Sequence, residues 1–184
     1  MRALLALLVL WSAPALGAPA AGKVFLTVDE ALKLAFPDSQ VERTTEYLTE
    51  AEEKHVEELA RAELASRVVH PYVARRDGEL VGTAYFDVHR VRTQNEVLMF
   101  VVGPDQRLRR VEVLAFAEPL EYMPRASFYA QFVGRPLDDE LDTKHAIRGV
   151  AGATLSAESA TAAARRVLAI QRVLAERAAP GPLR

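Results

Sequence analysis

The sequence predicts an α+β fold in which hairpins build an antiparallel sheet with flanking helices and a long C-terminal helix. Apolar residues alternate on both sides of Asp77-Gly78 and of Gly103-Pro104-Asp105, which is typical of two hairpins. The stretch from about Ala157 to Glu176 carries apolar residues at helical spacing. Strands and helices do not alternate regularly along the chain, which favours an antiparallel sheet over parallel βαβ units.

Residues 1–17 have the layout of a secretory signal peptide. Arg2 precedes an apolar run from Ala3 to Trp11, and small residues lead to a cleavage site after Gly17. The run is nine residues long, about half of what spans a bilayer, so we expect cleavage rather than a retained membrane anchor. The chain contains no cysteine, which excludes a lipoprotein anchor, disulfides and thiolate metal sites. We therefore expect an exported protein, periplasmic or in the cell envelope, that is soluble after cleavage.

Residues 18–66 are predicted to form an N-terminal helical segment. Thr27 and Thr49 each precede a glutamate by three positions, and both patterns fit a capping box at a helix start. The first helix should stop before the next proline, and the second should continue to about Leu64. Residues 40–48 between them are predicted to be extended.

Residues 67–177 are predicted to form the main domain, and residues 178–184 a short tail. In the first hairpin Arg76 should face Glu79, and His70 should face Tyr85. The face expected in the core holds Val69, Val73, Leu80, Ala84, Phe86 and Val88. The opposite, more polar face holds His70, Tyr72, Thr83, Tyr85, Asp87 and His89.

The second hairpin is expected to join residues 96–102 to residues 108–116. A short helix should follow at residues 124–132, and residues 135–148 have no clear assignment. The C-terminal helix is expected to turn four arginines outward, at Arg165, Arg166, Arg172 and Arg177. For the four histidines, at His55, His70, His89 and His145, surface or structural roles are favoured over a metal site.

The candidate site lies in residues 149–156, which are small and run directly into the C-terminal helix. Glycine and alanine leave the first backbone N–H groups of a helix unshielded, and such a helix start suits a phosphate. Thr154 places a hydroxyl where a phosphate would lie, and Ser156 is the expected helix cap. The alternative is a capped helix after a flexible loop that binds no ligand.

The segment Gly152-Ala153-Thr154-Leu155-Ser156 resembles the Gly-Ala-Thr-x-Ser/Thr signature of the FMN-binding domain family. That family includes the small flavin-carrying subunits of sodium-pumping NADH:quinone reductase and of the Rnf electron-transport complex. In these proteins a dedicated flavin transferase attaches FMN to the threonine of the signature through a phosphoester bond, and that position here is Thr154.

The resemblance covers roughly residues 70–172. Glu118 and Pro119 match the first and third positions of a Glu-Thr-Pro-Gly-like segment in the family. Residues 131–134 match its Gln-Phe-x-Gly-like turn. Six positions before Thr154 the family has an acidic residue, and this chain has Arg148. Three positions before it the family usually has Ser or Thr, and this chain has Ala151. Arg148 is suited to binding phosphate directly, so covalent and non-covalent FMN both remain open.

The resemblance implies an exported FMN-binding protein that relays electrons within a membrane-associated complex. Its partners would be redox proteins, membrane-bound ones among them, and a flavin transferase if FMN is covalent. Thr154 would anchor FMN, residues 152, 153, 155 and 156 would shape the site, and Glu118 would lie in the flavin-proximal segment. An electron carrier is favoured over a flavin-dependent reductase because no substrate pocket is apparent. The other alternative is a non-catalytic interaction or sensing module. The formal net charge of −2 gives no reason to expect a nucleic-acid partner.

Overall fold

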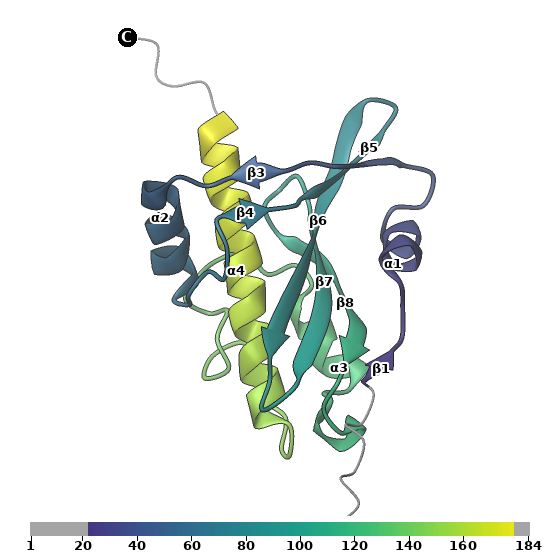
Figure 1. Ribbon diagram of the computed structural model, residues 1–184, viewed down its shortest axis with the longest axis vertical. Helices are drawn as coiled ribbons and strands as arrows, with labels where there is room; N and C mark the ends of the chain where they lie inside the picture. The colour runs from purple at the N-terminus through teal and green to yellow at the C-terminus, as the bar shows by residue number, and fades with distance from the viewer. Residues whose placement is uncertain (1–21, 179–184) are drawn as a thin grey trace, which may run out of the picture.

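A computed structural model describes residues 22–178 and confirms the predicted α+β class (Figure 1). The six-stranded sheet is antiparallel throughout, in the order β1-β8-β7-β6-β5-β2, and β3 and β4 form a separate pair. The strands are β1 (Lys23–Val24), β2 (Gln40–Arg43), β3 (Glu46–Tyr47), β4 (Val68–Val69), β5 (Tyr72–Arg76), β6 (Glu79–Arg90), β7 (Asn95–Val102) and β8 (Leu108–Phe116). The helices are α1 (Val28–Ala35), α2 (Glu50–Ala60), the 3-10 turn η1 (Leu120–Tyr122), α3 (Ala126–Tyr129), the 3-10 turn η2 (Ala130–Phe132) and α4 (Thr154–Ala178).

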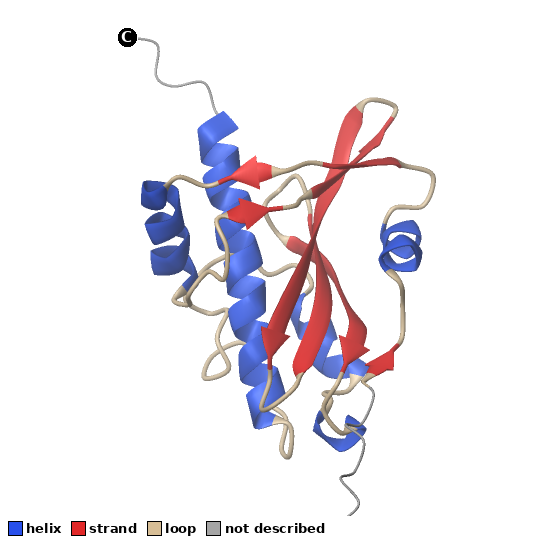
Figure 2. Cartoon of the chain, in the orientation of Figure 1, coloured by secondary structure: helices blue, strands red, loops and turns tan. Residues whose placement is uncertain are grey.

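Helices cover both faces of the sheet (Figure 2). The long helix α4 packs on one face, and its apolar side chains share a core with Leu98, Phe100 and Phe132. The short helix α1 packs on the other face, where Phe36 shares a second core with Met99. Helix α2 lies against α4 on the side away from the sheet. Because α4 is enclosed between α2 and the sheet, polar groups on most of its sides need partners within the protein.

The first predicted hairpin is present, but its register changes partway along. Arg76 pairs with Glu79 as predicted, whereas an irregularity between Ala74 and Arg75 makes Tyr72 pair with Ala84. A bulge inserts one extra residue and turns the following side chains to the other face. Tyr72 therefore lies on the α1 side. The predicted pairing of His70 with Tyr85 is wrong, because β5 begins after His70.

The predicted division of β6 into a core face and a polar face is also wrong. Ala84 and Phe86 pack in the core under α1 as expected, but Val88 is 59% exposed. On the face expected to be polar, Tyr85 joins the core under α4, and His89 is mostly buried. The face expected to be polar is buried because α4 covers it.

In the N-terminal segment both capping boxes are confirmed, with Thr27 and Thr49 as the caps. Helix α2 ends at Ala60 rather than near Leu64, because Arg61 takes a left-handed conformation with φ 55°. Residues predicted to be extended form β2 and β3. Strand β2 pairs with β5, so one continuous sheet crosses the predicted boundary between residues 66 and 67.

Helix α4 begins at Thr154, three residues before the expected start at Ala157. The prediction that its arginines point outward is wrong for Arg165, which is only 6% exposed. The Arg165 guanidinium donates to the carbonyls of Leu59 and Ala60, at 2.9 Å each, and to those of Asp138 and Leu141, at 2.7 and 3.2 Å. It thereby satisfies the last carbonyls of α2 and fixes part of the loop that had no assignment. Arg166, Arg172 and Arg177 also bind groups on other elements.

The predicted signal peptide, residues 1–17, lies outside the described residues, as does most of the tail. Within residues 22–178, no helix combines the length and the apolar character that crossing a bilayer requires.

We predict that Arg165→Met destabilises the fold. Methionine keeps much of the apolar stem but leaves four backbone carbonyls without their donor, at about 1–3 kcal/mol for each one that stays buried. The free energy of unfolding from urea denaturation measures the loss. The control is Arg125→Met at an exposed position, expected to change stability by less than about 0.5 kcal/mol. If the two substitutions changed the free energy of unfolding equally, Arg165 would not stabilise the fold through its bonds to these carbonyls.

Candidate functional site

Thr154 is the first residue of α4 and is exposed, as are Gly152 and Leu155 on either side. Gly152 has φ +82°, a left-handed conformation that favours glycine, and open space surrounds the position of a β-carbon there. Ala153, which directly precedes Thr154, has no side-chain acceptor with which to cap the helix. Because the first N–H groups of a helix lack intrahelical partners, this end of α4 presents donors and a positive dipole end beside the Thr154 hydroxyl.

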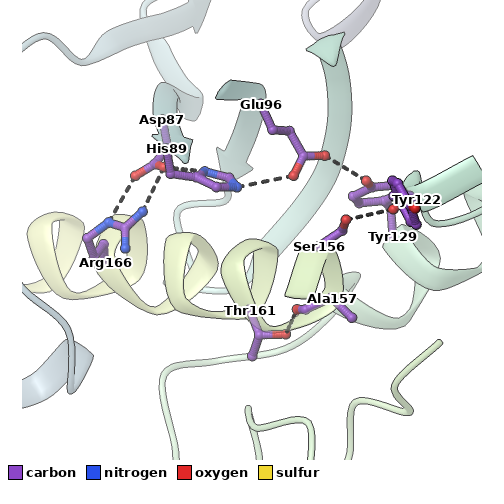
Figure 3. A network of polar contacts seen from close by, with 9 residues as sticks. All are labelled: Asp87, His89, Glu96, Tyr122, Tyr129, Ser156, Ala157, Thr161 and Arg166. Atoms are coloured by element: carbon purple, nitrogen blue, oxygen red, sulfur yellow. Dashed lines mark hydrogen bonds and ion pairs between the residues drawn. The ribbon is translucent and has the colours of Figure 1, made fainter. Parts of the chain in front are cut away.

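Ser156 does not cap the helix, because α4 begins two residues before it. Its side chain is buried, and its hydroxyl donates to the carbonyl of Tyr122 at 2.6 Å (Figure 3). The predicted capping role is therefore wrong. The bond instead joins the first turn of α4 to η1, which follows Glu118 in the chain.

Glu118 lies in a loop that packs against the turn between β6 and β7. Its carboxylate accepts hydrogen bonds from the N–H groups of Thr93 and Gln94, at 2.5 and 2.8 Å, and from the Thr93 hydroxyl at 3.1 Å. The two backbone donors hold the pKa of Glu118 below its usual range. The carboxylate is thus engaged with this turn. From the same turn, the Arg92 guanidinium lies 4.5 Å from the centre of the Tyr122 ring.

Arg148 lies in the loop that leads into α4, six residues before Thr154. Its backbone N–H donates to the Gln131 side chain at 2.8 Å, and its carbonyl accepts from the same side chain at 3.2 Å. A cavity of about 540 Å³ is lined there by Gln131, Arg135, Arg148 and Val150, among others. In the described part of the chain no hydrogen bond joins Arg148 to Thr154. The site residues therefore form two separate groups: Thr154 and Ser156 with the Tyr122 segment, and Arg148 with Gln131 and the cavity.

A buried polar network that sequence reasoning missed lies between the sheet and α4 (Figure 3). Arg166 donates to both carboxylate oxygens of Asp87, at 2.8 and 3.1 Å. The His89 ring lies between Asp87, 2.8 Å from Nδ1, and Glu96, 3.1 Å from Nε2. Glu96 is fully buried and also accepts from the Tyr129 hydroxyl at 2.8 Å. The network joins β6, β7, α3 and α4.

Both ring nitrogens of His89 face carboxylate oxygens, and both can donate only when the ring is protonated. In that state the charges of the network also balance. Burial opposes the charged ring, but the bonds to Asp87 and Glu96 outweigh it and raise the pKa of His89. Burial likewise opposes ionisation of Asp87, and the bonds from His89 and Arg166 outweigh it and lower the pKa of Asp87. The positive groups of His89 and Arg166 then face the carboxylates of Asp87 and Glu96. The alternation of Asp87 and His89 was visible in the sequence, but their partners on other elements were not.

We predict that His89→Gln destabilises the protein in a pH-dependent way. Removing one partner of a buried ion pair costs about 3–5 kcal/mol. The pKa of His89 is higher in the folded than in the unfolded chain, where it is about 6.5. The stabilisation is thus complete below about pH 6.5 and is lost as the pH rises through the folded-state pKa.

Urea denaturation from pH 6 to 9 tests this prediction. The difference between the original chain and His89→Gln should be largest at pH 6 and should shrink towards pH 9. The control is His55→Gln, since His55 is about half exposed and lies 3.5 Å from Glu176. A difference that stays constant with pH would indicate a neutral His89 in the folded state.

Comparison with protein-family models, curated proteins and solved structures found no match to this chain. Within residues 22–178, no group of three or more acidic or histidine side chains is arranged to hold a metal ion. The groups present at the α4 start are the exposed Thr154 hydroxyl and the first N–H donors of the helix.

Proposed function

We propose that this chain is an exported FMN-binding protein that relays electrons between partner proteins, with the FMN phosphate anchored at Thr154. One observation carries the proposal: the Thr154 hydroxyl is exposed at the start of a 25-residue helix that no side chain of the preceding residue caps. A phosphate suits such a position because helix N–H groups and the helix dipole both favour an anion. The dipole alone contributes about 0.3–1 kcal/mol.

The residues around Thr154 fit a phosphate group. The open space beside Gly152 lets a ligand approach the backbone closely. Arg148 and Arg135 line the cavity that Gly149 and Val150, a few residues before Thr154, also line; both supply positive charge, and an arginine can bind two phosphate oxygens at once. Arg148 stands where the FMN-binding family has an acidic residue, which supports direct phosphate binding as an addition or an alternative to a covalent bond.

When bound, FMN would supply a ring that takes up one or two electrons, and the protein would supply orientation and environment. The Ser156–Tyr122 bond keeps the first turn of α4 at a fixed position relative to η1. Glu118 holds the turn between β6 and β7, whose Arg92 covers the Tyr122 ring. These contacts would give the site a rigid frame on two sides.

A second candidate is a non-catalytic interaction or sensing module that binds FMN non-covalently or not at all. Arg148 and Ala151 favour it, because both depart from the pattern that a flavin transferase meets in the family. For the first candidate the partners are redox proteins, membrane-bound ones included, together with the transferase where FMN is covalent.

We predict that Thr154→Val abolishes covalent flavin. After co-expression with a flavin transferase, the purified chain should absorb in the flavin bands, and mass spectrometry should find an FMN-sized adduct on the peptide that contains Thr154. Valine keeps the shape of threonine without the hydroxyl, so the adduct should disappear. Thr154→Ser keeps a hydroxyl and should retain it.

The remaining outcomes separate the two modes of binding. If flavin stays with Thr154→Val and leaves on denaturation, binding is non-covalent, and Arg148→Gln should then weaken FMN affinity at least tenfold. A colourless chain after co-expression, with no affinity for added FMN, would contradict the proposed function.

A further inference from the structure

Strand β6 pairs with a different strand along each of its two edges, and the two pairings cover different parts of it. Strand β7 pairs with it from Thr83 to Arg90. On the other edge, β5 pairs with it only from Glu79 to Ala84, because β5 begins at Tyr72 and the chain before it belongs to the separate β3–β4 pair. Within residues 22–178, no strand covers this edge over residues 85–90. An uncovered edge presents unpaired N–H and C=O groups, here over a length of roughly 20 Å.

A groove runs along this uncovered edge. It is a cavity of about 620 Å³, lined by residues 85–90 of β6 and by residues 63–66 and 68–70, among others. Three of its lining residues are exposed valines: Val28 at 38%, Val68 at 39% and Val88 at 59%. Apolar side chains beside an open strand edge are the features that strand addition uses, since main-chain bonds give affinity and side-chain pockets give specificity.

The charge around the groove favours an acidic occupant. Arg43 and Arg90 line it, are exposed, and form no salt bridge within residues 22–178. Asp87 also lines it but is neutralised by Arg166. Glu63 is the other acidic residue of the lining. Two free arginines against one glutamate leave the rim positive, which steers and binds negatively charged segments.

The terminal segments of this chain are poorly suited to the groove. Lys23 pairs with β8, at the edge of the sheet opposite to β5 and β2. Residues 179–184 read Ala-Pro-Gly-Pro-Leu-Arg. Proline cannot donate to a strand ladder, and the arginine would meet a positive rim.

We propose that the uncovered edge of β6 over residues 85–90 is a docking site for an extended acidic segment of a partner protein. The segment would add to the sheet as a strand beside β6, set its apolar side chains against Val68 and Val88, and place its carboxylates near Arg43 and Arg90. This site lies apart from the α4 start and does not require flavin.

A designed peptide tests the proposal on the purified chain. The probe is fluorescein-labelled Glu-Val-Asp-Val-Glu-Thr with blocked ends, and its binding is followed by fluorescence anisotropy. A Lys-Val-Lys-Val-Lys-Thr peptide controls for charge, and the acidic peptide with a central proline controls for strand pairing. We expect only the acidic peptide to bind, with affinity falling as salt increases. Amide hydrogen exchange by NMR should show new protection within residues 85–90.

Two variants locate the interaction. Arg43→Glu combined with Arg90→Glu should weaken binding at least tenfold, while Arg125→Glu, at an exposed position outside the groove lining, should leave it unchanged. Val88→Pro removes one backbone donor from the edge and should also reduce binding. If Val88→Pro does not fold, as judged by circular dichroism, the charge variants and the exchange data decide.

Three results would overturn the proposal. The first is no binding of the acidic peptide, or equal binding of the acidic and lysine peptides. The second is binding without protection in residues 85–90. The third is a dimer in sedimentation with these amides already protected in the absence of peptide, which would identify a second copy of the chain as the occupant.

Discussion

Two neighbouring arginines on α4 determine how the layers of this protein fit together. Arg165 donates to the carbonyls at the end of α2 and to the loop around Asp138, whereas Arg166 binds Asp87 on the sheet. Successive helix residues point about 100° apart, so one turn of α4 is fixed to both of its neighbours. Apolar packing alone would allow α4 to slide or rotate against its neighbours. Hydrogen bonds from the two guanidinium groups to specific acceptors fix its position.

The network beyond Arg166 extends this constraint across the sheet. Burying four ionisable groups is costly unless their charges are paired and their hydrogen bonds are complete. Here each carboxylate oxygen of Asp87 and of Glu96 accepts a bond from His89, Arg166 or Tyr129. The sheet can therefore carry polar residues under α4, where an apolar layer would be usual. The same contacts hold α3 against β7, and α3 leads into the Gln131 that supports Arg148.

Features that depend only on residues close together in the sequence could be predicted. The fold class, both capping boxes, the two hairpin turns and the presence of a long C-terminal helix follow from short patterns of residues, whereas the expected start of that helix is three residues too late. The bulge leaves Val81 of β6 without a partner, between the pairs Ala74–Gly82 and Arg75–Leu80. Gly82 inside the strand pattern is a sign of it in the sequence, but a glycine alone does not fix the register. The inward position of Arg165 depends on α2, which lies about a hundred residues earlier in the chain, and α4 itself carries no sign of that neighbour.

In the candidate site, too, local features could be predicted and contacts between distant segments could not. The small residues and the exposed hydroxyl at Thr154 are local features, and the sequence identified them. The bond from Ser156 to Tyr122 joins positions 34 residues apart, and the engagement of Glu118 with Gln94 spans 24 residues. Both contacts depend on how separate loops meet at one end of the sheet. The expected capping role of Ser156 failed for the related reason that α4 begins two residues earlier than that role requires.

The burial of Ser156 has a consequence for regiochemistry. Thr154 and Ser156 are two hydroxyl residues two positions apart, and under the proposed covalent attachment an unfolded chain would offer both to the flavin transferase. In the folded helix they point about 200° apart. One is committed to an internal carbonyl, and the other remains accessible. If FMN is attached as proposed, the tertiary structure would therefore leave a single hydroxyl available as the acceptor, a choice that the short peptide motif alone could not make.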